Sequence, residues 1–267
     1  MSASVDLARE RLLLQEAAIL AAATWPAGAI IDRVELLSEA SSTQDEARER
    51  CGNRAGLMVM ALTQHAGRGR LGRDWRHAPG KGIAATFVLS PACPVGEVAL
   101  RAGLAALAAA QSRVSVPLGM RWPNDVVLRS DYRRKLAGVL VERRDDLFFL
   151  GIGLNVLHQP ADWPTNLAPR ATSLALLGSR DESIFPAARE LITQVTRVVA
   201  QSIEELTRVW HAADVLIGTT QTFEHDRRRV TGVVEGIEPT SEIRVRTASG
   251  VIEHLPAQTT SMIHDDH

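Results

Sequence analysis

The chain has 267 residues, of which 45% are hydrophobic and 23% are charged, a composition typical of an ordinary globular protein rather than a largely disordered one. It carries 30 lysines and arginines against 31 acids, a formal net charge of −1. The chain as a whole therefore gives no reason to expect a nucleic acid or an anionic membrane as partner. Its two cysteines, Cys51 and Cys93, form no CxxC pair, which excludes a disulfide framework and argues against structural zinc.

The start of the chain lacks the basic and apolar pattern of a secretory signal. Residues 5–24 have apolar residues near helical spacing, and Pro26 with Gly28 ends that pattern, so residues 1–29 are expected to form an N-terminal helix and a linker. No stretch reaches the roughly 20 apolar residues that a membrane helix needs. We therefore expect a cytoplasmic protein without a membrane partner.

Two strands and a helix start are predicted next. Residues 30–37 and 57–63 have strand patterns. Between them, Ser42 and Thr43 stand where a helix N-cap is expected, ahead of acids in the first turn. Residues 64–82 contain five glycines, one proline and no apolar periodicity. Such a long loop in a compact domain is usually functional or mobile.

The middle of the chain alternates strand and helix patterns. In order, these are a strand at 83–89, an alanine-rich helix at 96–111, a strand at 120–132 interrupted by a Trp-Pro-Asn turn, and two strands at 136–142 and 147–155. The last two are expected to pair as a hairpin. Apolar residues then recur with a period near 3.6 over residues 184–210, which predicts one long amphipathic helix covering a sheet.

After Asp214 the pattern changes to short strands separated by turn residues, at 229–235, 242–247 and 251–255. This indicates a small all-β domain at residues 214–267 that follows a larger domain at residues 30–213. So small a unit has too little core to be stable easily alone, so we expect it to pack on its neighbour.

The segment GRGRLGRDWR at residues 67–76 is rich in both arginine and glycine. Guanidinium groups are forked donors for anions, and glycines let the backbone wrap closely around a bound group. A desolvated phosphate would gain on the order of 1.5–3 kcal/mol from each charge-assisted hydrogen bond, whereas solvated arginines would gain little. The segment therefore predicts a polyphosphate site on a loop that orders when the ligand binds.

Three other interpretations of this loop stay open. Gly67, Gly69 and Gly72 match the dinucleotide pattern GxGxxG, although prolyl and glycyl residues after it prevent the helix that this pattern requires. An arginine–glycine strip could bind single-stranded nucleic acid, although Trp75 is its sole aromatic residue. The loop could also be a solvated basic loop, but then its glycines would cost backbone entropy without a return.

Other segments accompany the loop in a fixed order. They are Ser42, Thr43 and Gln44 at the helix start, Gln64 before the loop, RWPND at 121–125, KLAGVLVE at 135–142 and GIGLNV at 151–156. Together these segments closely resemble the catalytic domain of the biotin protein ligases over residues 30–215, with a weaker resemblance beyond. The resemblance implies an α+β fold, in which a mixed β-sheet catalytic domain of the biotin/lipoate protein ligase type carries a small C-terminal SH3-like β domain.

The same resemblance implies the reaction and its participants. Biotin and ATP with Mg²⁺ would give biotinyl-5'-AMP and diphosphate, and a lysine of a biotin carboxyl carrier protein would then take the biotinyl group. The carrier would belong to a carboxylase. Because a carboxylate must approach a phosphate, fixed positive charge at their junction is the main catalytic requirement.

Roles for individual residues follow from their match to the family motifs. The implied catalytic residues are Arg68 and Lys135. The implied biotin-binding residues are Ser42, Thr43, Gln44, Gln64, Arg68, Gly69, Arg70, Lys135 and Gly138. The implied ATP-binding residues are Arg68, Arg70, Arg73, Trp75, Asn124, Lys135 and Asn155. Asp125 is a weak candidate for a magnesium ligand, and it could equally cap a turn.

The chain departs from the family pattern at several places. Gln44 stands where asparagine is commoner, and Arg121 stands where lysine is usual, which keeps the charge but changes its geometry. The glycine-rich turn before the last strand is replaced by residues 257–260. Ser42 and Thr43 could also serve as simple helix caps without touching a ligand.

Rival functions remain open at this point. A lipoate ligase or octanoyl transferase would share the fold, although the arginine and serine–glycine run typical of those enzymes does not occur in the sequence. An RNA-binding module built on the arginine loop is a rival from another class. We expect no sequence-specific DNA binding, because the residues before the first strand are too few for a helix-turn-helix domain. A monomer and a homodimer are equally compatible with the sequence.

Overall fold

The computed structural model of the protein describes residues 30–76 and 78–263. The helix predicted within residues 1–29 lies outside the described residues. In this part of the chain, no helix is long and apolar enough to cross a membrane.

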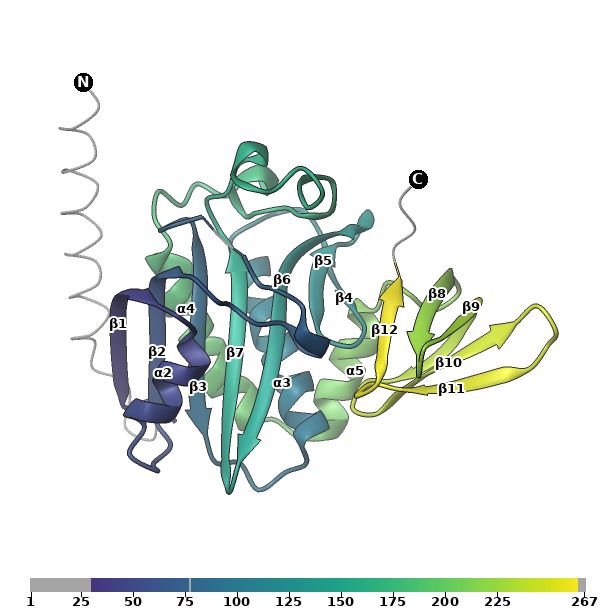
Figure 1. The fold of residues 1–267 in the computed structure, drawn as a ribbon, viewed down its shortest axis with the longest axis horizontal. Helices are drawn as coiled ribbons and strands as arrows, with labels where there is room; N and C mark the ends of the chain where they lie inside the picture. Colours follow the sequence, from purple (N-terminus) through teal and green to yellow (C-terminus); the bar gives the residue numbers. More distant parts are fainter. Residues whose placement is uncertain (1–29, 77, 264–267) are drawn as a thin grey trace.

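A seven-stranded mixed sheet forms the centre of the larger domain (Figure 1). Its strands are β1 (Arg33–Ala40), β2 (Leu57–Gln64), β3 (Gly82–Leu89), β4 (Leu118–Arg121), β5 (Asp125–Leu128), β6 (Asp131–Arg144) and β7 (Leu147–Asn155). They lie in the order β1-β2-β3-β7-β6-β5-β4, with β1 and β2 parallel and the other neighbours antiparallel. The predicted hairpin is confirmed, since β6 pairs with β7 along its length.

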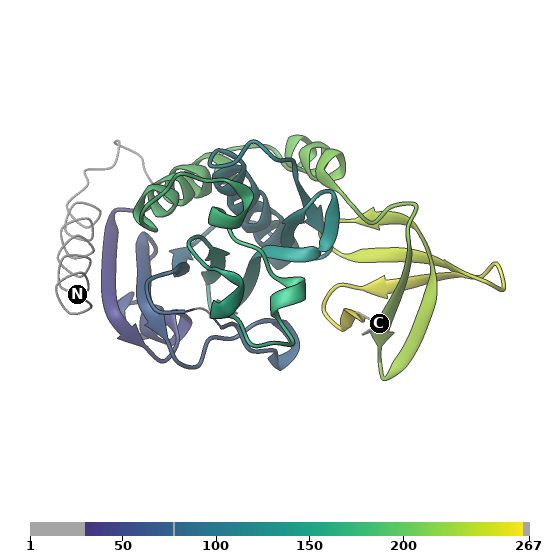
Figure 2. The ribbon, with the colours of Figure 1, turned by 90° about the horizontal axis from the view of Figure 1, so that it is seen from above.

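Helices cover the two faces of this sheet unequally. On one face, α3 (Val95–Gln111) packs against β6 and β7, and α4 (Phe185–Val199) and α5 (Ile203–Ala213) pack on α3. Five of the seven alanines of α3 are buried, and their small side chains allow close approach to the strands. On the other face lie α2 (Thr43–Arg50) and the loop after β2, which crosses in front of β7 and β6 (Figures 1 and 2). This second face remains partly open.

The prediction of one long helix over residues 184–210 is wrong. The chain leaves α4 at Ala200, and Ser202 is the N-cap of α5, where its hydroxyl accepts a hydrogen bond from the Glu205 N–H at 3.2 Å. This N-cap satisfies a backbone donor that a continuous helix would have satisfied internally. The apolar period runs on across the break because both helices pack on α3.

A five-stranded antiparallel sheet forms the C-terminal unit. Its strands are β8 (Thr220–His225), β9 (Arg228–Glu238), β10 (Glu242–Thr247), β11 (Ile252–Pro256) and β12 (Thr260–Ile263), in the order β11-β10-β9-β8-β12. The sequence predicted β9, β10 and β11 but missed β8 and β12. The expected α+β class, a mixed sheet with helices followed by a small β unit, is confirmed.

The two sheets share one apolar core. Trp122, which follows β4, and Phe223 of β8 are 2% and 0% exposed, and their rings meet edge to face with centroids 6.4 Å apart. The β unit therefore packs on the larger domain, as its small size led us to expect, and this contact holds it beside the open face of the large sheet.

Candidate active site

A pocket of about 530 Å³ opens on the face of the large sheet that carries α2. Its walls come from the start of α2, the loop after β2, the β4–β5 turn, the facing strands β6 and β7, and β12 of the small sheet. The structure brings together all the residues that the family motifs pointed to: Ser42, Thr43, Gln44, Gln64, Arg68, Gly69, Arg70, Arg73, Trp75, Asn124, Asp125, Lys135, Gly138 and Asn155. Their roles in binding or catalysis stay predictions.

Two glycines form the floor of the pocket. Gly138 on β6 lies directly opposite Gly153 on β7, and the indole of Trp75 packs on them so closely that a Cβ on Gly153 would overlap its ring. The Lys135 ammonium lies 5.4 Å from the centre of the same ring, a cation–π distance. Glycine is required at position 153 because any side chain there would lift the indole off the sheet.

One end of the pocket is neutral and polar. Ser42, Thr43 and Gln44 are at most 4% exposed. The Thr43 N–H and hydroxyl donate to the Gln64 side-chain oxygen at 2.9 and 3.2 Å, and the buried Thr86 hydroxyl donates to the Thr43 hydroxyl at 2.9 Å. Ser42 occupies the N-cap of α2, yet its side chain makes no cap hydrogen bond to the described backbone. Simple capping therefore does not account for Ser42.

Gln44 leaves one oxygen unused. Its side-chain nitrogen donates to the carbonyl oxygens of Leu140 and Phe149 at 3.2 and 3.3 Å. Because carbonyl oxygens can only accept, this contact fixes the orientation of the amide. Its oxygen Oε1 is buried and has no hydrogen-bond partner among the described residues. Burying an acceptor in this way is costly unless a donor reaches it.

The other end of the pocket is cationic. The Lys135 ammonium lies 2.6 Å from one oxygen of Asp125, and the Arg121 guanidinium lies 2.7 Å from the other. Burial of Asp125 opposes its charge, but the two cations outweigh that effect and hold the pKa of its carboxyl well below the usual range. Arg121 also donates to the Tyr132 carbonyl at 2.8 Å. Asp125 therefore fixes the positions of two cations rather than capping a turn.

The arginine loop forms a small hairpin across the pocket. The Trp75 N–H donates to the Gly67 carbonyl at 2.9 Å, and the Gly69 N–H donates to the Arg73 carbonyl at 2.6 Å. Its tip is a 3₁₀ turn, Arg70–Gly72. The Arg70 guanidinium donates to the carbonyl of Ala257, just before β12, and burial lowers the pKa of Arg70. The loop thus touches the small sheet at the stretch where the family pattern was missing.

Two asparagines on opposite sides of the pocket are held by main-chain carbonyls. The Asn124 amide donates to the Val139 carbonyl, which ties the β4–β5 turn to β6. Asn155, which is 4% exposed, donates to the Thr172 carbonyl at 3.0 Å, and its own oxygen Oδ1 is buried without a partner in the described chain. This second buried acceptor could receive a hydrogen bond from an amino group of a ligand.

The residues of the pocket do not fit a resident magnesium site. No three His, Cys, Asp or Glu side chains within residues 30–76 and 78–263 are grouped to hold a metal. Both oxygens of Asp125 already face cations, and Mg²⁺ prefers oxygens that it need not share with positive groups. The ion that the resemblance implied would therefore arrive with the triphosphate as part of the substrate.

Several lining residues were missed from the sequence. These are Arg133, Trp163, Leu167 and Arg170 around the mouth, and Glu224, Ser261, Met262 and Ile263 from the small sheet. Thr86 does not line the pocket but supports Thr43 from beneath, and it was missed too, although one polar residue inside the apolar run at 83–89 was a signal. The residues of the small sheet carried no local signal, because they reach the pocket only through the packing of one sheet on the other.

The fold and the pocket define a class of protein. The model of the biotin/lipoate A/B protein ligase family matches residues 39–156, which is less than half of the chain. The match spans the polar end, the arginine loop, the cationic end and the glycine floor. It ends before α4, α5 and the small sheet.

The chain is also similar to biotin protein ligases, and the resemblance noted from the sequence is confirmed. It is 34% identical over 145 residues to the bifunctional ligase/repressor BirA of Bacillus subtilis, covering 51% of this chain and 44% of that protein. It is 36% identical over 156 residues to the biotin–acetyl-CoA-carboxylase ligase of Mycobacterium tuberculosis, covering 55% and 56%. The chain thus spans about half the length of these curated relatives.

The fold extends the similarity beyond the region matched by sequence. The biotin protein ligase from Aquifex aeolicus in complex with biotin and ATP superposes with a TM-score of 0.74 at 25% identity, covering 87% of this chain and 99% of that one. Both the mixed seven-stranded sheet and the small antiparallel sheet therefore belong to an architecture found among biotin protein ligases.

Proposed function

We propose that this protein is an ATP-dependent biotin protein ligase, which forms biotinyl-5'-AMP and then transfers the biotinyl group to a lysine of a carrier protein. The observation that carries the proposal is the division of the pocket into a neutral polar end at Gln44 and a cationic end at Lys135, above a glycine floor. Biotin has the same division, with a neutral ureido ring at one end and a carboxylate at the other.

The polar end suits the ureido group. Its two N–H groups need acceptors, and Gln44 Oε1 is a buried acceptor without a partner among the described residues. Its carbonyl needs a donor, which the Ser42 hydroxyl can supply. A lipoyl or octanoyl chain has no such groups and would leave these buried polar atoms unsatisfied, so this end of the pocket favours biotin over the aliphatic alternatives.

The cationic end suits the chemistry of the first step. A carboxylate oxygen of biotin attacks the α-phosphorus of ATP, the new P–O bond forms, and the bond to the β-phosphate breaks with its electrons leaving on diphosphate. Lys135 and Arg68 would neutralise the two anions as they approach. Arg70 and Arg73 would hold the phosphates, and Asn155 Oδ1 would accept from the adenine amino group, with Trp75 against the ring.

The second step needs a lysine amine from outside the pocket. The neutral amine attacks the carbonyl carbon of the mixed anhydride, the amide C–N bond forms, the C–O bond to the phosphate breaks with its electrons leaving on AMP, and the amine releases a proton. We assign the carrier to the biotin carboxyl carrier protein of a carboxylase, because the similar protein of M. tuberculosis is a biotin–acetyl-CoA-carboxylase ligase. We further propose that the protein acts in the cytoplasm.

Two measurements on the unaltered chain test this function. Biotin should stimulate exchange of labelled diphosphate into ATP, and a biotin carboxyl carrier domain should gain the mass of one biotinyl group when incubated with the protein, biotin and MgATP. Octanoate and lipoate should support neither. Exchange driven by octanoate or lipoate, or by no acid at all, would reject biotin as the substrate.

A further inference from the structure

The principal partner of Arg68 in the structure is Asp45 on α2. The two guanidinium NH₂ groups of Arg68 donate to the two carboxylate oxygens of Asp45, both at 2.7 Å. This bidentate geometry gives the strongest hydrogen bonding between an arginine and a carboxylate. The pKa of Asp45 is lowered, with the hydrogen bond from Arg68 as its main cause, and the pKa of Arg68 is raised chiefly by the same bond.

Asp45 is itself held in position. Arg48, one turn further along α2, donates to an Asp45 oxygen at 2.9 Å and pairs with Glu142 of β6. The Arg48 guanidinium also lies 5.5 Å from the centre of the Phe149 ring. Asp45 is therefore held in place by Arg48 beside the polar end of the pocket, with its carboxylate facing the arginine loop.

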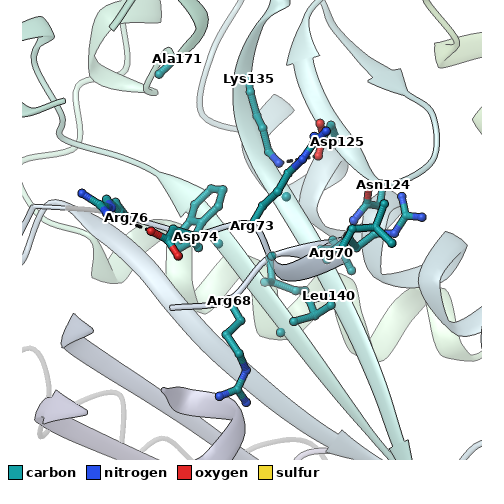
Figure 3. A pocket seen from close by; sticks show the side chains of 18 of the residues that line it. Arg68, Arg70, Arg73, Asp74, Arg76, Asn124, Asp125, Lys135, Leu140 and Ala171 are labelled. Atoms are coloured by element: carbon teal, nitrogen blue, oxygen red, sulfur yellow. Dashed lines mark hydrogen bonds and ion pairs between the residues drawn. The ribbon is translucent and has the colours of Figure 1, made fainter. Parts of the chain in front are cut away.

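The pair with Asp45 turns Arg68 away from the cationic end. Figure 3 shows the Arg68 side chain pointing away from the Lys135 and Asp125 pair, whereas Arg73 from the same loop points toward it. The side chains of Arg68 and Asp45 are 40% and 41% exposed. Water weakens a pair that is this exposed, so another carboxylate can replace Asp45 at modest cost.

We propose that Asp45 is a positioning residue that competes with the carboxylate of the substrate for the Arg68 guanidinium. The inference rests on the proposed function, because it takes an acid as the substrate. Arg68 then exchanges one carboxylate partner for another when the acid binds, and Asp45 sets how readily that exchange occurs.

The competition predicts the direction in which biotin affinity changes when Asp45 is replaced. An Asp45→Asn variant removes the charge that holds Arg68 and keeps the shape of the side chain. Biotin should then bind about two- to fivefold more tightly, the ratio that corresponds to losing an exposed ion pair. The gain should be absent for biotinamide, in which a neutral carboxamide replaces the carboxylate. Both dissociation constants can be measured by titration calorimetry without ATP.

Two further variants serve as controls. Asp45→Glu retains a carboxylate and should restore near-normal affinity. Asp32 makes a comparable two-pronged pair with Arg54, at 2.8 and 3.3 Å, and it does not line the pocket, so Asp32→Asn should leave biotin affinity unchanged. In the exchange assay, Asp45→Asn should lower the KM for biotin without raising kcat.

The possible failures are distinguishable. If the unaltered protein binds biotin and Asp45→Asn shows equal or weaker affinity, the inference is overturned while the proposed function stands. An equal gain for biotinamide also overturns it, since Arg68 would not be the cause. If the unaltered protein does not bind biotin, the proposed function fails and the inference fails with it.

Discussion

Lys135 lies between a carboxylate and an indole, 2.6 Å from Asp125 and 5.4 Å from the Trp75 ring centre. These contacts already hold its ammonium at the cationic end, so little further side-chain entropy is lost when a ligand binds there. In Lys135→Ala, biotin-dependent diphosphate exchange should fall by about a hundredfold or more, the usual effect of removing one preorganised charge-stabilising donor.

A matched lysine provides the control for this prediction. Lys81 pairs with Asp162, also at 2.6 Å, but it does not line the pocket. Lys81→Ala should therefore keep the exchange rate close to that of the unaltered protein. Equal losses in the two variants would show that the effect of Lys135→Ala is structural, and an undiminished rate in Lys135→Ala would reject its catalytic role.

Asp125 stabilises the fold as well as the site. Because its pKa is lowered in the folded protein, its contribution is complete above the unfolded-state pKa of about 4 and is lost as the pH falls below that value. Asp125→Asn leaves Arg121, 5% exposed, without its counter-charge, which should cost roughly 3 kcal/mol of unfolding free energy.

Urea unfolding at several pH values tests this assignment. The difference between Asp125→Asn and the unaltered protein should be equal at pH 7 and pH 5 and smaller at pH 3. Asp145, whose side chain is 90% exposed, supplies the control, since Asp145→Asn should change stability little at any of these values. A difference that grows toward acid pH would contradict the pairing.

The sequence identified the pocket residues well but not their partners. Each predicted site residue lines the pocket, because each short motif specifies both the type of side chain and its place along the chain. The contacts of Arg68 with Asp45, and of Arg70 with the Ala257 carbonyl, join segments 23 and 187 residues apart. Contacts of this kind depend on how the elements pack, and no local pattern reports them.

At the scale of elements, the facing glycines of β6 and β7 set how deeply the arginine loop can sit. Gly153→Ala should push the indole of Trp75 off the floor, because the added Cβ would overlap the ring. We expect a shift of tryptophan emission to longer wavelength and about a tenfold rise in the KM for ATP, as for other small misplacements of binding groups.

A second substitution isolates the source of the signal. The emission shift caused by Gly153→Ala should disappear when Trp75 is already phenylalanine, since the three atoms nearest to the added Cβ all belong to Trp75. Persistence of the shift in the double variant would mean that the sheet itself had rearranged. The effect of Gly153→Ala would then not come from displacement of Trp75.

The errors in predicting elements have a common physical origin. The break between α4 and α5 falls at Ser202, where a Ser-x-x-Glu pattern signals a helix start, but the continuous apolar period concealed it. Strands β8 and β12 lie at one side of the small sheet, paired with each other, and β12 is only four residues long. A strand that short has too few alternations for its period to be recognised.

At the scale of the whole molecule, the shared core should make the two sheets unfold together. Phe223 contributes a fully buried ring that packs on Trp122. Phe223→Ala should lower the unfolding free energy by about 3–5 kcal/mol, and far-UV circular dichroism and tryptophan fluorescence should still report one coincident urea transition.

A substitution on the same small sheet serves as reference. Val233 on β9 is 41% exposed, so Val233→Ala should change the unfolding free energy by no more than about 0.5 kcal/mol. Two separate transitions for Phe223→Ala, one for each sheet, would remain compatible with a packed interface but would disprove a single cooperative unit.

The overall architecture was easier to predict than the relation between its parts. Apolar and polar residues alternate clearly enough in β9, β10 and β11 to predict an all-β unit. Because that unit is small, we expected it to pack on a neighbour. Where it packs was not predictable, because the contact depends on Trp122 and Phe223, which are far apart in sequence. The contribution of β12 to the pocket depends on that packing.

The near-neutral total charge conceals an uneven distribution. Eight cationic and three acidic side chains line the pocket, while the whole chain sums to −1, so the rest of the protein is markedly acidic. The molecule therefore behaves as an electrical dipole, and an incoming polyanion is turned toward the mouth while it is still beyond contact range. Encounter with a nucleotide should consequently slow as ionic strength rises, even though the total charge alone would predict no attraction.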